Sequence, residues 1–358
     1  MNTDTKLHER SIKETLCNHF NTPFATSHLT IRERSFPGLG GGQFRYYYFT
    51  LRNNATTHRA FGKVAGHLER EYQALQHLVK TIPEEHRHIG HPIALLRDGD
   101  QALLLLEYLE GYSNSFTIRS SLRLLPNTYL SITRMGKYIL DNIYGLQKHW
   151  KTTYSPLSVE DIESTPGQPS PIGVLKQIDT TKALSMETKA ALRTRISALL
   201  QNQCMVRRGL VHATLGVRNV MFSDSSIAFI DWAYMQEEGL CIFDPCYITT
   251  MLLMKGVQLF VPQATLDKIN NSLFEHIGQL ENQTWQANNN MCMQDPTFIR
   301  DGLWFGKTLA MIDTLWQYEQ GESSWLRASL TQRHRQLRYL THRIETDANT
   351  GAECNGRL

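Results

Sequence analysis

The 358-residue sequence contains no hydrophobic run that approaches the roughly 20 apolar residues of a membrane-spanning helix. Residues 1–16, MNTDTKLHERSIKETL, are polar from the start and do not have the pattern of a secretory signal. The formal net charge is only +3, and there is neither a block of like charges nor a basic stripe with interleaved aromatic residues. These absences argue against a membrane protein and against a nucleic-acid-binding protein.

Cysteine pairs with the spacing of a zinc site are also missing. The six cysteines are scattered, and the pair Cys241 and Cys246 is accompanied by no second pair of cysteines or histidines. We therefore expect two buried thiols. Free thiols are typical of reducing compartments, so a cytoplasmic protein is expected. The content of 41% hydrophobic and 20% charged residues is that of an ordinary soluble protein.

The N-terminal part of the chain has the pattern of a small sheet with a few helices. Alternating segments rich in β-branched and aromatic residues predict strands, and apolar residues at helical spacing predict helices. Two apolar runs around Asp98, Gly99 and Asp100 predict a hairpin. A helix is expected at 6–20, strands at 28–36, 44–52 and 58–66, a second helix at 67–80 and the hairpin at 91–111.

The pattern becomes mainly helical after residue 111. A long helix is expected over 129–150, a loop rich in Pro, Ser and Gly over 151–175, and another helix over 186–205. Several helices are expected over 246–343. We therefore predict a sheet-rich N-terminal lobe over 1–110, a helical C-terminal lobe over 111–345 and a disordered tail over 346–358.

Two features of the N-terminal lobe are suited to binding phosphate. Lys63 lies on the third predicted strand, among apolar residues, although a solvated lysine at a sheet edge would give the same pattern. Glycines crowd the turn between the first two strands, where backbone could approach a polyanion closely or could simply form a flexible turn. These glycines are Gly38, Gly40, Gly41 and Gly42.

Glu71 shares the apolar face of its predicted helix with Leu68 and Leu75. A carboxylate on an inner face needs a partner, and Lys63 on the preceding strand is the natural one. A surface position for Glu71 is the alternative.

Asn219 and Asp231 flank two short apolar strands in VMFSDSSIAFID. Oxygen ligands at the ends of adjacent strands suit Mg²⁺, which also keeps waters and phosphate oxygens. The alternative is a turn asparagine and a strand-end aspartate, and both are common.

Together, and in this order, these features resemble the aminoglycoside phosphotransferase and choline-kinase-like group of small-molecule kinases. The catalytic-loop pattern His-x-Asp-x-x-x-x-Asn of that group is similar to residues 212–219, HATLGVRN. The metal-binding Asp followed by an aromatic residue is similar to Asp231-Trp232, and an Asp-Pro that often follows is similar to Asp244-Pro245. The stretch LEYLEG, 106–111, resembles the hinge that cups adenine. The resemblance runs from about residue 28 to at least residue 250.

The resemblance implies an α+β, bilobal protein-kinase-like fold that binds ATP and Mg²⁺ and phosphorylates a small hydroxyl acceptor. The glycine turn and Lys63, held by Glu71, would bind phosphates, and Asn219 and Asp231 would bind the metal. Glu107 and Leu109 would belong to the adenine hinge. The sequence identifies neither the acceptor nor an oligomeric state.

The catalytic loop departs from the family pattern at one position. Thr214 occupies the place of the aspartate that accepts the proton of the substrate hydroxyl, and a threonine hydroxyl is no base near neutral pH. His212 is the remaining titratable residue of the loop, although in the family it mainly supports the loop. Three hypotheses follow: a phosphotransferase with altered catalytic-loop chemistry, an inactive pseudokinase that senses nucleotide or acts as a scaffold, and a kinase-fold enzyme that transfers a nucleotidyl group.

Overall fold

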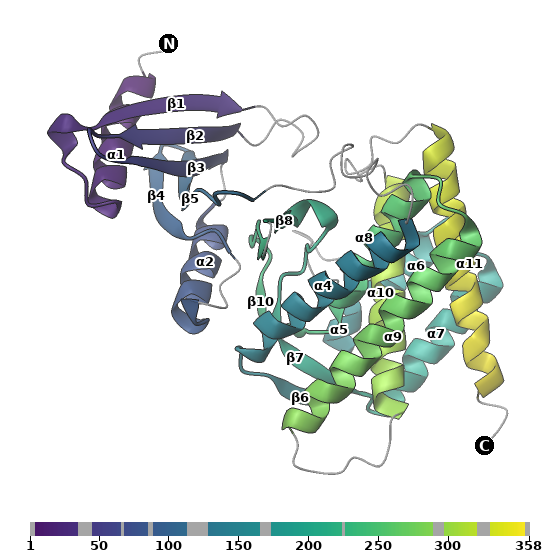
Figure 1. Ribbon diagram of the computed structural model, residues 1–358. Helices are drawn as coiled ribbons and strands as arrows, with labels where there is room; N and C mark the ends of the chain where they lie inside the picture. Colours follow the sequence, from purple (N-terminus) through teal and green to yellow (C-terminus); the bar gives the residue numbers. More distant parts are fainter. Residues whose placement is uncertain are drawn as a thin grey trace. The chain divides into compact units, whose positions relative to one another are not determined.

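The computed structural model describes residues 4–34, 45–65, 68–84, 89–112, 128–164, 173–223, 226–288, 297–320 and 330–354 (Figure 1). The chain divides into two compact units. The first comprises Met1–Ser113 and Phe222–Ala233, and the second comprises Asn114–Met221 and Tyr234–Leu358. The segment 222–233, which we had assigned to the helical lobe, thus belongs to the first unit, where Asp231 contacts Lys63 and Phe229 forms a parallel bridge with Ile89.

The first unit is built on a five-stranded antiparallel sheet in the order β1-β2-β3-β5-β4. The strands confirm the predicted ones, and Gly99, at φ +54°, lies in the predicted turn between β4 and β5. The elements of this unit before residue 113 are α1 (Asp4–His19), η1 (Phe24–Thr26), β1 (His28–Arg34), β2 (Arg45–Arg52), β3 (Thr57–Ala65), α2 (Glu69–Thr81), β4 (Pro92–Asp98) and β5 (Gln101–Glu107).

Strand alternation gives this sheet two different faces. One face, which we call the core face, carries Phe49, Leu51 and Leu105 and is covered by Ile12 and Leu16 of α1. Packing on the core face is close enough that a Cβ atom at position 62 would approach Cε2 of Phe49 to 2.5 Å, which explains the glycine there. The opposite face carries Lys63, and we call it the Lys63 face.

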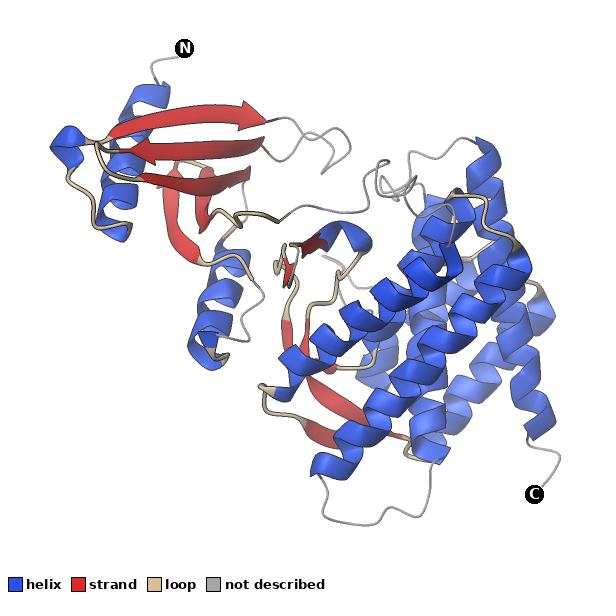
Figure 2. Cartoon of the chain, viewed as in Figure 1, coloured by secondary structure: helices blue, strands red, loops and turns tan. Residues whose placement is uncertain are grey.

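The second unit is mainly helical (Figure 2). Its sheet has three antiparallel strands in the order β10-β7-β6, and the hairpin of β8 and β9 contains the point where the chain returns to the first unit. The two units have the secondary structure predicted for the α+β fold class, one antiparallel sheet with a key helix and one mainly helical part. The remaining elements are α4 (Thr128–Lys148), β6 (Thr153–Pro156), α5 (Val159–Glu163), α6 (Val174–Thr180), α7 (Met186–Gln201), β7 (Met205–Val211), η5 (Val217–Asn219), β8 (Val220–Phe222), β9 (Ile227–Phe229), β10 (Gln236–Leu240), α8 (Phe243–Gln258), α9 (Gln263–Asn288), α10 (Thr297–Gln320) and α11 (Leu330–Cys354).

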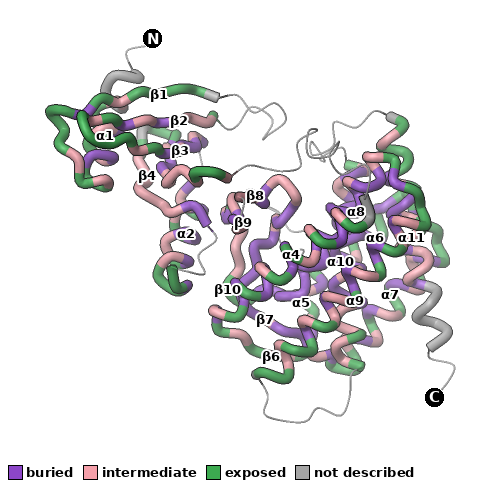
Figure 3. Tube along the Cα trace, viewed as in Figure 1, coloured by how far each residue is buried: buried purple, intermediate pink, exposed green. Residues whose placement is uncertain are grey.

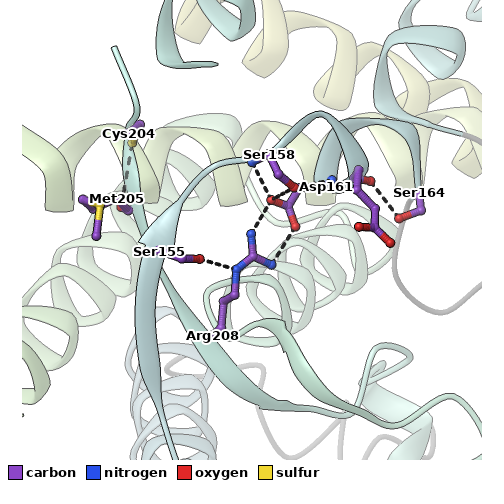
Figure 4. Close-up of polar contacts among 8 residues, drawn as sticks. Ser155, Ser158, Asp161, Ser164, Cys204, Met205 and Arg208 are labelled. Carbon is purple, nitrogen blue, oxygen red and sulfur yellow. Dashed lines mark hydrogen bonds and ion pairs between the residues drawn. The ribbon is translucent and has the colours of Figure 1, made fainter. Parts of the chain in front are cut away.

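The segment 151–175 is not the continuous loop that its composition predicted. It contains β6, α5 and the start of α6, while residues 165–172 lie outside the described part of the chain. Arg208 of β7 fixes this segment, because its guanidinium donates to both carboxylate oxygens of Asp161 and to Oγ of Ser155 (Figure 4). Ser158 caps α5, and its backbone N–H and hydroxyl donate to Asp161 as well. Side-chain hydrogen bonds therefore order a stretch whose composition favours a loop.

The C-terminal tail is also more ordered than predicted. The expectation of disorder from residue 346 is wrong for residues 346–354, which form the last turns of α11. Asp347 pairs with Lys307 of α10 at 2.6 Å, and Ala348 is buried. Residues 355–358 lie outside the described part of the chain.

The core of the second unit confirms the prediction of two buried thiols. Cys241 and Cys246 are buried, and burial raises the pKa of the Cys241 thiol to about 12, as expected of unreactive thiols. Most of the neighbouring strand β7 is buried as well (Figure 3). The aromatic residues of α10 also belong to the core of this unit. They are Trp304, Phe305, Trp316 and Tyr318, and all of them are buried.

Within the described residues, the helices are all too short or too polar to cross a lipid bilayer.

The contact between Arg208 and Asp161 leads to a pH-dependent prediction. Burial would raise the pKa of Asp161, but hydrogen bonds from Arg208 and Ser158 lower it below its ordinary value. A lowered carboxyl pKa stabilises the fold above the unfolded value of about 3.9, and this contribution is lost as the pH falls through the folded value. We expect Asp161→Asn to destabilise the protein by about 1.5–3 kcal/mol at neutral pH, with the difference from wild type shrinking below about pH 4.

Urea unfolding at neutral and acidic pH measures this effect. Asp179→Asn is the matched control, because its partner Arg193 is exposed and the pair should contribute less than about 1 kcal/mol. Equal losses for the two variants, or a loss at Asp161 that does not depend on pH, would contradict the prediction.

Candidate functional site

Lys63 lies between two carboxylates in the first unit. Its Nζ donates to Oε2 of Glu71 at 2.8 Å and to Oδ1 of Asp231 at 2.7 Å. Lys63 is 6% exposed and Glu71 is 2% exposed, whereas the Asp231 side chain is 46% exposed. The expected ion pair between Lys63 and Glu71 is therefore present, and neither residue is a solvated surface residue. We call Lys63, Glu71 and Asp231 the lysine trio.

Local structure explains how β3 and α2 meet at this point. Strand alternation puts Lys63 on the same face of the sheet as Leu104, its register partner on β5. Glu71 belongs to the first turn of α2 and shares the buried side of that helix with Leu75 and Leu78. Glu69 lies at the edge of α2 and pairs with the exposed Arg97. Because one side of α2 is apolar and buried, Glu71 on that side is the buried carboxylate and Glu69 is not.

Asp231 is held by a turn with unusual backbone geometry. Its φ is +67°, in the left-handed region that side chains other than glycine rarely adopt. The next residue, Trp232, is 1% exposed and donates from Nε1 to the carbonyl of Phe229 at 2.9 Å. A buried anchor thus keeps a half-exposed carboxylate in a strained conformation, which is typical of functional positions.

The charges of the lysine trio shift the pKa values of Lys63 and Glu71. Burial opposes the charged form of Lys63, but Glu71 and Asp231 raise its pKa above the ordinary value. Burial raises the pKa of the Glu71 carboxyl in spite of the Lys63 charge, which lowers it. One ammonium group therefore serves two carboxylates, and Asp231 is the one that is accessible to solvent.

The predicted catalytic loop lies in the second unit and is held by Asp244. The carboxylate of this residue accepts the backbone N–H of His212 at 2.5 Å and that of Ala213 at 2.9 Å. Asp244 is 2% exposed, and burial raises its pKa to about 7 although both N–H donors lower it. Ala213 has a φ of +68°, so this contact holds the loop in a strained conformation.

Thr214 and Asn219 complete the loop geometry. Nδ2 of Asn219 donates to the carbonyl of Thr214 at 2.9 Å, which orients Oδ1 of Asn219 as the atom suited to a metal. Oγ1 of Thr214 lies 3.3 Å from Nδ1 of the buried His212. Thr214 is half-buried. The hydroxyl therefore has a defined position beside an imidazole.

The other residues that were predicted to bind nucleotide are the four glycines of the turn, Glu107 and Leu109. Gly38, Gly40, Gly41 and Gly42 lie outside the described residues. Oε1 of Glu107, the last residue of β5, lies 2.8 Å from Nε2 of His19 and accepts its hydrogen bond. The carbonyl of Leu109 accepts the N–H of Tyr112 at 3.3 Å. These contacts place Glu107 and Leu109 at the end of the sheet that carries Lys63.

The structure brings together Lys63, Glu71 and Asp231 in the first unit, and His212, Thr214 and Asn219 in the second. The loop-holding role of Asp244 was missed, although the Asp-Pro motif had singled this residue out. Among the described residues, no three His, Cys, Asp or Glu side chains form a metal cluster. Asp231 in the first unit and Asn219 in the second each carry an oxygen donor of the type that Mg²⁺ prefers.

No protein-family model and no curated protein matches the sequence. Solved structures are similar in fold. The aminoglycoside phosphotransferase APH(4)-Ia is 12% identical, with a TM-score of 0.49 over 95% of this chain and 98% of that chain. The ethanolamine kinase of Plasmodium vivax is 12% identical, with a TM-score of 0.43 over 88% of this chain and 82% of that chain. The spectinomycin phosphotransferase APH(9)-Ia, solved with ADP and spectinomycin, is 12% identical, with a TM-score of 0.37 over 89% of this chain and 92% of that chain. Because these TM-scores are below 0.5, we base the function on the motifs and contacts of this chain.

Proposed function

We propose that the protein binds Mg²⁺ and ATP and transfers a phosphoryl group to a hydroxyl of a sugar, an amino alcohol or a similar small metabolite. The observation that carries this proposal is the buried Lys63 between Glu71 and Asp231. A buried lysine held by a buried carboxylate is a preorganised cation for phosphate, and an accessible aspartate beside it suits a metal. The motif order in the sequence supports the same assignment.

Each residue of the lysine trio has a separate role in this proposal. Lys63 contacts phosphate oxygens, and Glu71 orients Lys63 without touching the nucleotide. Asp231, together with Asn219 of the catalytic loop, holds magnesium, as the sequence predicted. When bound, magnesium neutralises phosphate charge in a loose, anionic transition state. Gly38, Gly40, Gly41 and Gly42 would cover the phosphates, and Glu107 and Leu109 would flank the base.

The catalytic loop has altered chemistry in this proposal. The Thr214 hydroxyl orients the acceptor hydroxyl by hydrogen bonding but takes no proton from it. Loss of a general base costs about 10²–10⁴ in rate, and positioning and magnesium still supply much of the acceleration. His212 supports Thr214 from the buried side of the loop. A slow phosphotransferase is the expected result.

Thr214 also favours a second candidate function, a pseudokinase that binds nucleotide without turnover. Both candidates bind nucleotide at the lysine trio, but only the phosphotransferase transfers a phosphoryl group to an acceptor. A screen of sugars, amino alcohols and related hydroxyl compounds for ADP release separates them. Nucleotide binding without turnover on any acceptor would favour the pseudokinase.

We expect Mg·ATP to stabilise the protein by about 2.7 kcal/mol at a ligand concentration of 100 times Kd, as measured by thermal unfolding. Lys63→Ala should remove most of this stabilisation, because the phosphates lose their buried cation. The unliganded variant should also be less stable by about 3–5 kcal/mol, because Glu71 is left buried without a partner. Asp231→Ala should remove the magnesium dependence.

Lys80→Ala is the control, since Lys80 is an exposed lysine in the last turn of α2. The double variant Lys63→Met, Glu71→Leu separates binding from folding, because it leaves no buried charge at this pair. Equal ATP affinity in wild type and in this double variant would rule out Lys63 as a phosphate ligand.

Replacing Thr214 tests the altered loop. Because no base is lost, Thr214→Ala should change any transfer rate by less than about tenfold. Thr214→Asp should restore a proton acceptor and raise kinase or ATPase turnover, measured at saturating Mg²⁺ so that the added charge is neutralised. Thr214→Ser keeps the hydroxyl and serves as the control. A loss of more than about a hundredfold in Thr214→Ala would show that the hydroxyl itself carries the chemistry.

A further inference from the structure

A buried arginine of the second unit joins β7 to α4, which packs against both β7 and α9 (Figure 1). Nη2 of Arg207 donates to Oε1 of Glu281 on α9 at 2.7 Å, and Nε donates to Oε2 at 3.3 Å. Nη2 also donates to Oε1 of Gln147 on α4 at 2.8 Å. Tyr144 of α4 donates its hydroxyl to Oε1 of Glu281 at 2.7 Å. We call Gln147, Arg207, Glu281 and Tyr144 the amide network.

Gln147 extends this network to the backbone that leads into the predicted catalytic loop. Its Nε2 donates to the carbonyl of Leu210 at 3.2 Å and to the carbonyl of Cys241 at 3.1 Å. Leu210 lies two residues before His212, where the loop begins. Cys241 lies three residues before Asp244, whose carboxylate accepts two backbone N–H groups of the loop. One amide group therefore joins the backbone in front of the loop to the backbone in front of the residue that holds it.

Arg207 fixes the direction in which the Gln147 amide points. The guanidinium carries only donors and therefore needs Oε1, whereas the two backbone carbonyls are acceptors and therefore need Nε2. The reverse orientation would set the amide oxygen against two carbonyl oxygens and its N–H groups against the guanidinium. Gln147 is 2% exposed, and at this depth unmade hydrogen bonds cost the desolvation of each group. A single orientation of the amide is therefore compatible with its neighbours.

Stability alone gives little reason for a buried ion pair at this place. The Arg207 side chain is 2% exposed and the Glu281 side chain is 12% exposed. Burial opposes the charged form of Arg207, and Glu281 raises its pKa well above the ordinary value. Apolar residues of similar size often stabilise a core as well as such a pair does, because both charges lose their hydration. A defined orientation of Gln147 is something that apolar residues would not supply.

We propose that Gln147 is a positioning residue for the catalytic loop, and that Arg207, Glu281 and Tyr144 hold its amide in the required orientation. The inference rests on the proposed function, since it assigns the amide network a part in phosphoryl transfer. Gln147 acts through the backbone on both sides of the contact between Asp244 and the loop, and so sets the position of Thr214. A displacement of about 1 Å near reacting groups can lower a rate by about a hundredfold, so a contact behind the loop can control the rate.

Gln147→Met tests the proposal, with Gln336→Met as the matched control. Gln336 of α11 is also buried, and its Nε2 donates to the carbonyl of Met254 on α8 at 3.1 Å. Each variant removes a buried hydrogen bond to backbone carbonyls, so both should be destabilised. Only Gln147→Met should speed hydrogen exchange at the backbone amides of His212 and Ala213, by at least about tenfold, because only this variant loosens the loop. Nuclear magnetic resonance of the protein without ligand measures these exchange rates.

Turnover separates a positioning role from a purely structural one. At saturating Mg·ATP, ADP release should fall at least about tenfold in Gln147→Met, while the Kd for Mg·ATP changes by less than about threefold. Gln336→Met should keep both values. The triple variant Arg207→Met, Glu281→Leu, Tyr144→Phe leaves no buried charge and no unpaired hydroxyl in the network. It should reproduce the faster exchange and the slower turnover, because the amide of Gln147 is no longer oriented.

Each other result has a defined meaning. Unchanged exchange at His212 and Ala213 in Gln147→Met would overturn the proposal, and so would an equal increase in Gln336→Met. Faster exchange with an unchanged rate of ADP release would also overturn it, because the network would then stabilise the loop without serving the reaction. Wild-type protein that binds no nucleotide or shows no turnover would instead refute the proposed function, and the exchange rates would still decide whether Gln147 holds the loop.

Discussion

Neutralisation of one buried lysine is the constraint on which the candidate site depends. Lys63 stays charged inside the first unit because Glu71 and Asp231 accept its hydrogen bonds at 2.8 and 2.7 Å. Glu71 is buried and has no other role in our account than to hold the lysine. The half-exposed Asp231 is, in our proposal, the residue of the trio that binds a metal. The position of β9, the polarity of α2 and the strained backbone at residue 231 all serve this arrangement.

In the second unit, a buried carboxylate fixes the strained backbone of the predicted catalytic loop. The carboxylate of Asp244 accepts the backbone N–H groups of His212 and Ala213, and Ala213 has a φ of +68°. Asn219 binds the loop again at the carbonyl of Thr214. A loop held at both ends can position a hydroxyl precisely even without a base. This geometry supports our proposal that the Thr214 hydroxyl orients an acceptor without taking its proton.

The sequence predicted those parts of the structure that depend on local patterns. Alternation identified β1 to β3, two apolar runs around a turn identified β4 and β5, and helical spacing placed Glu71 on the inner face of its helix. The contact between Lys63 and Asp231 joins positions 168 residues apart, so no local pattern reveals it. The strand β7 was missed because MVRRGLV carries two arginines, which are buried or half-buried only because Glu281 and Asp161 pair with them. The last turns of α11 were missed for a similar reason, since Asp347 acquires its partner Lys307 only in the folded protein.

The central claim, that Lys63 contacts the phosphates of a bound nucleotide, is tested most directly by nuclear magnetic resonance. The side-chain Nζ resonance of ¹⁵N-labelled lysine can be assigned by its loss in Lys63→Met. Our account predicts that Mg·ATP shifts this resonance, because phosphate and metal replace Asp231 as neighbours of the ammonium group. Tripolyphosphate with magnesium should shift it in the same direction. An unchanged Lys63 resonance in protein that is saturated with nucleotide would contradict the account.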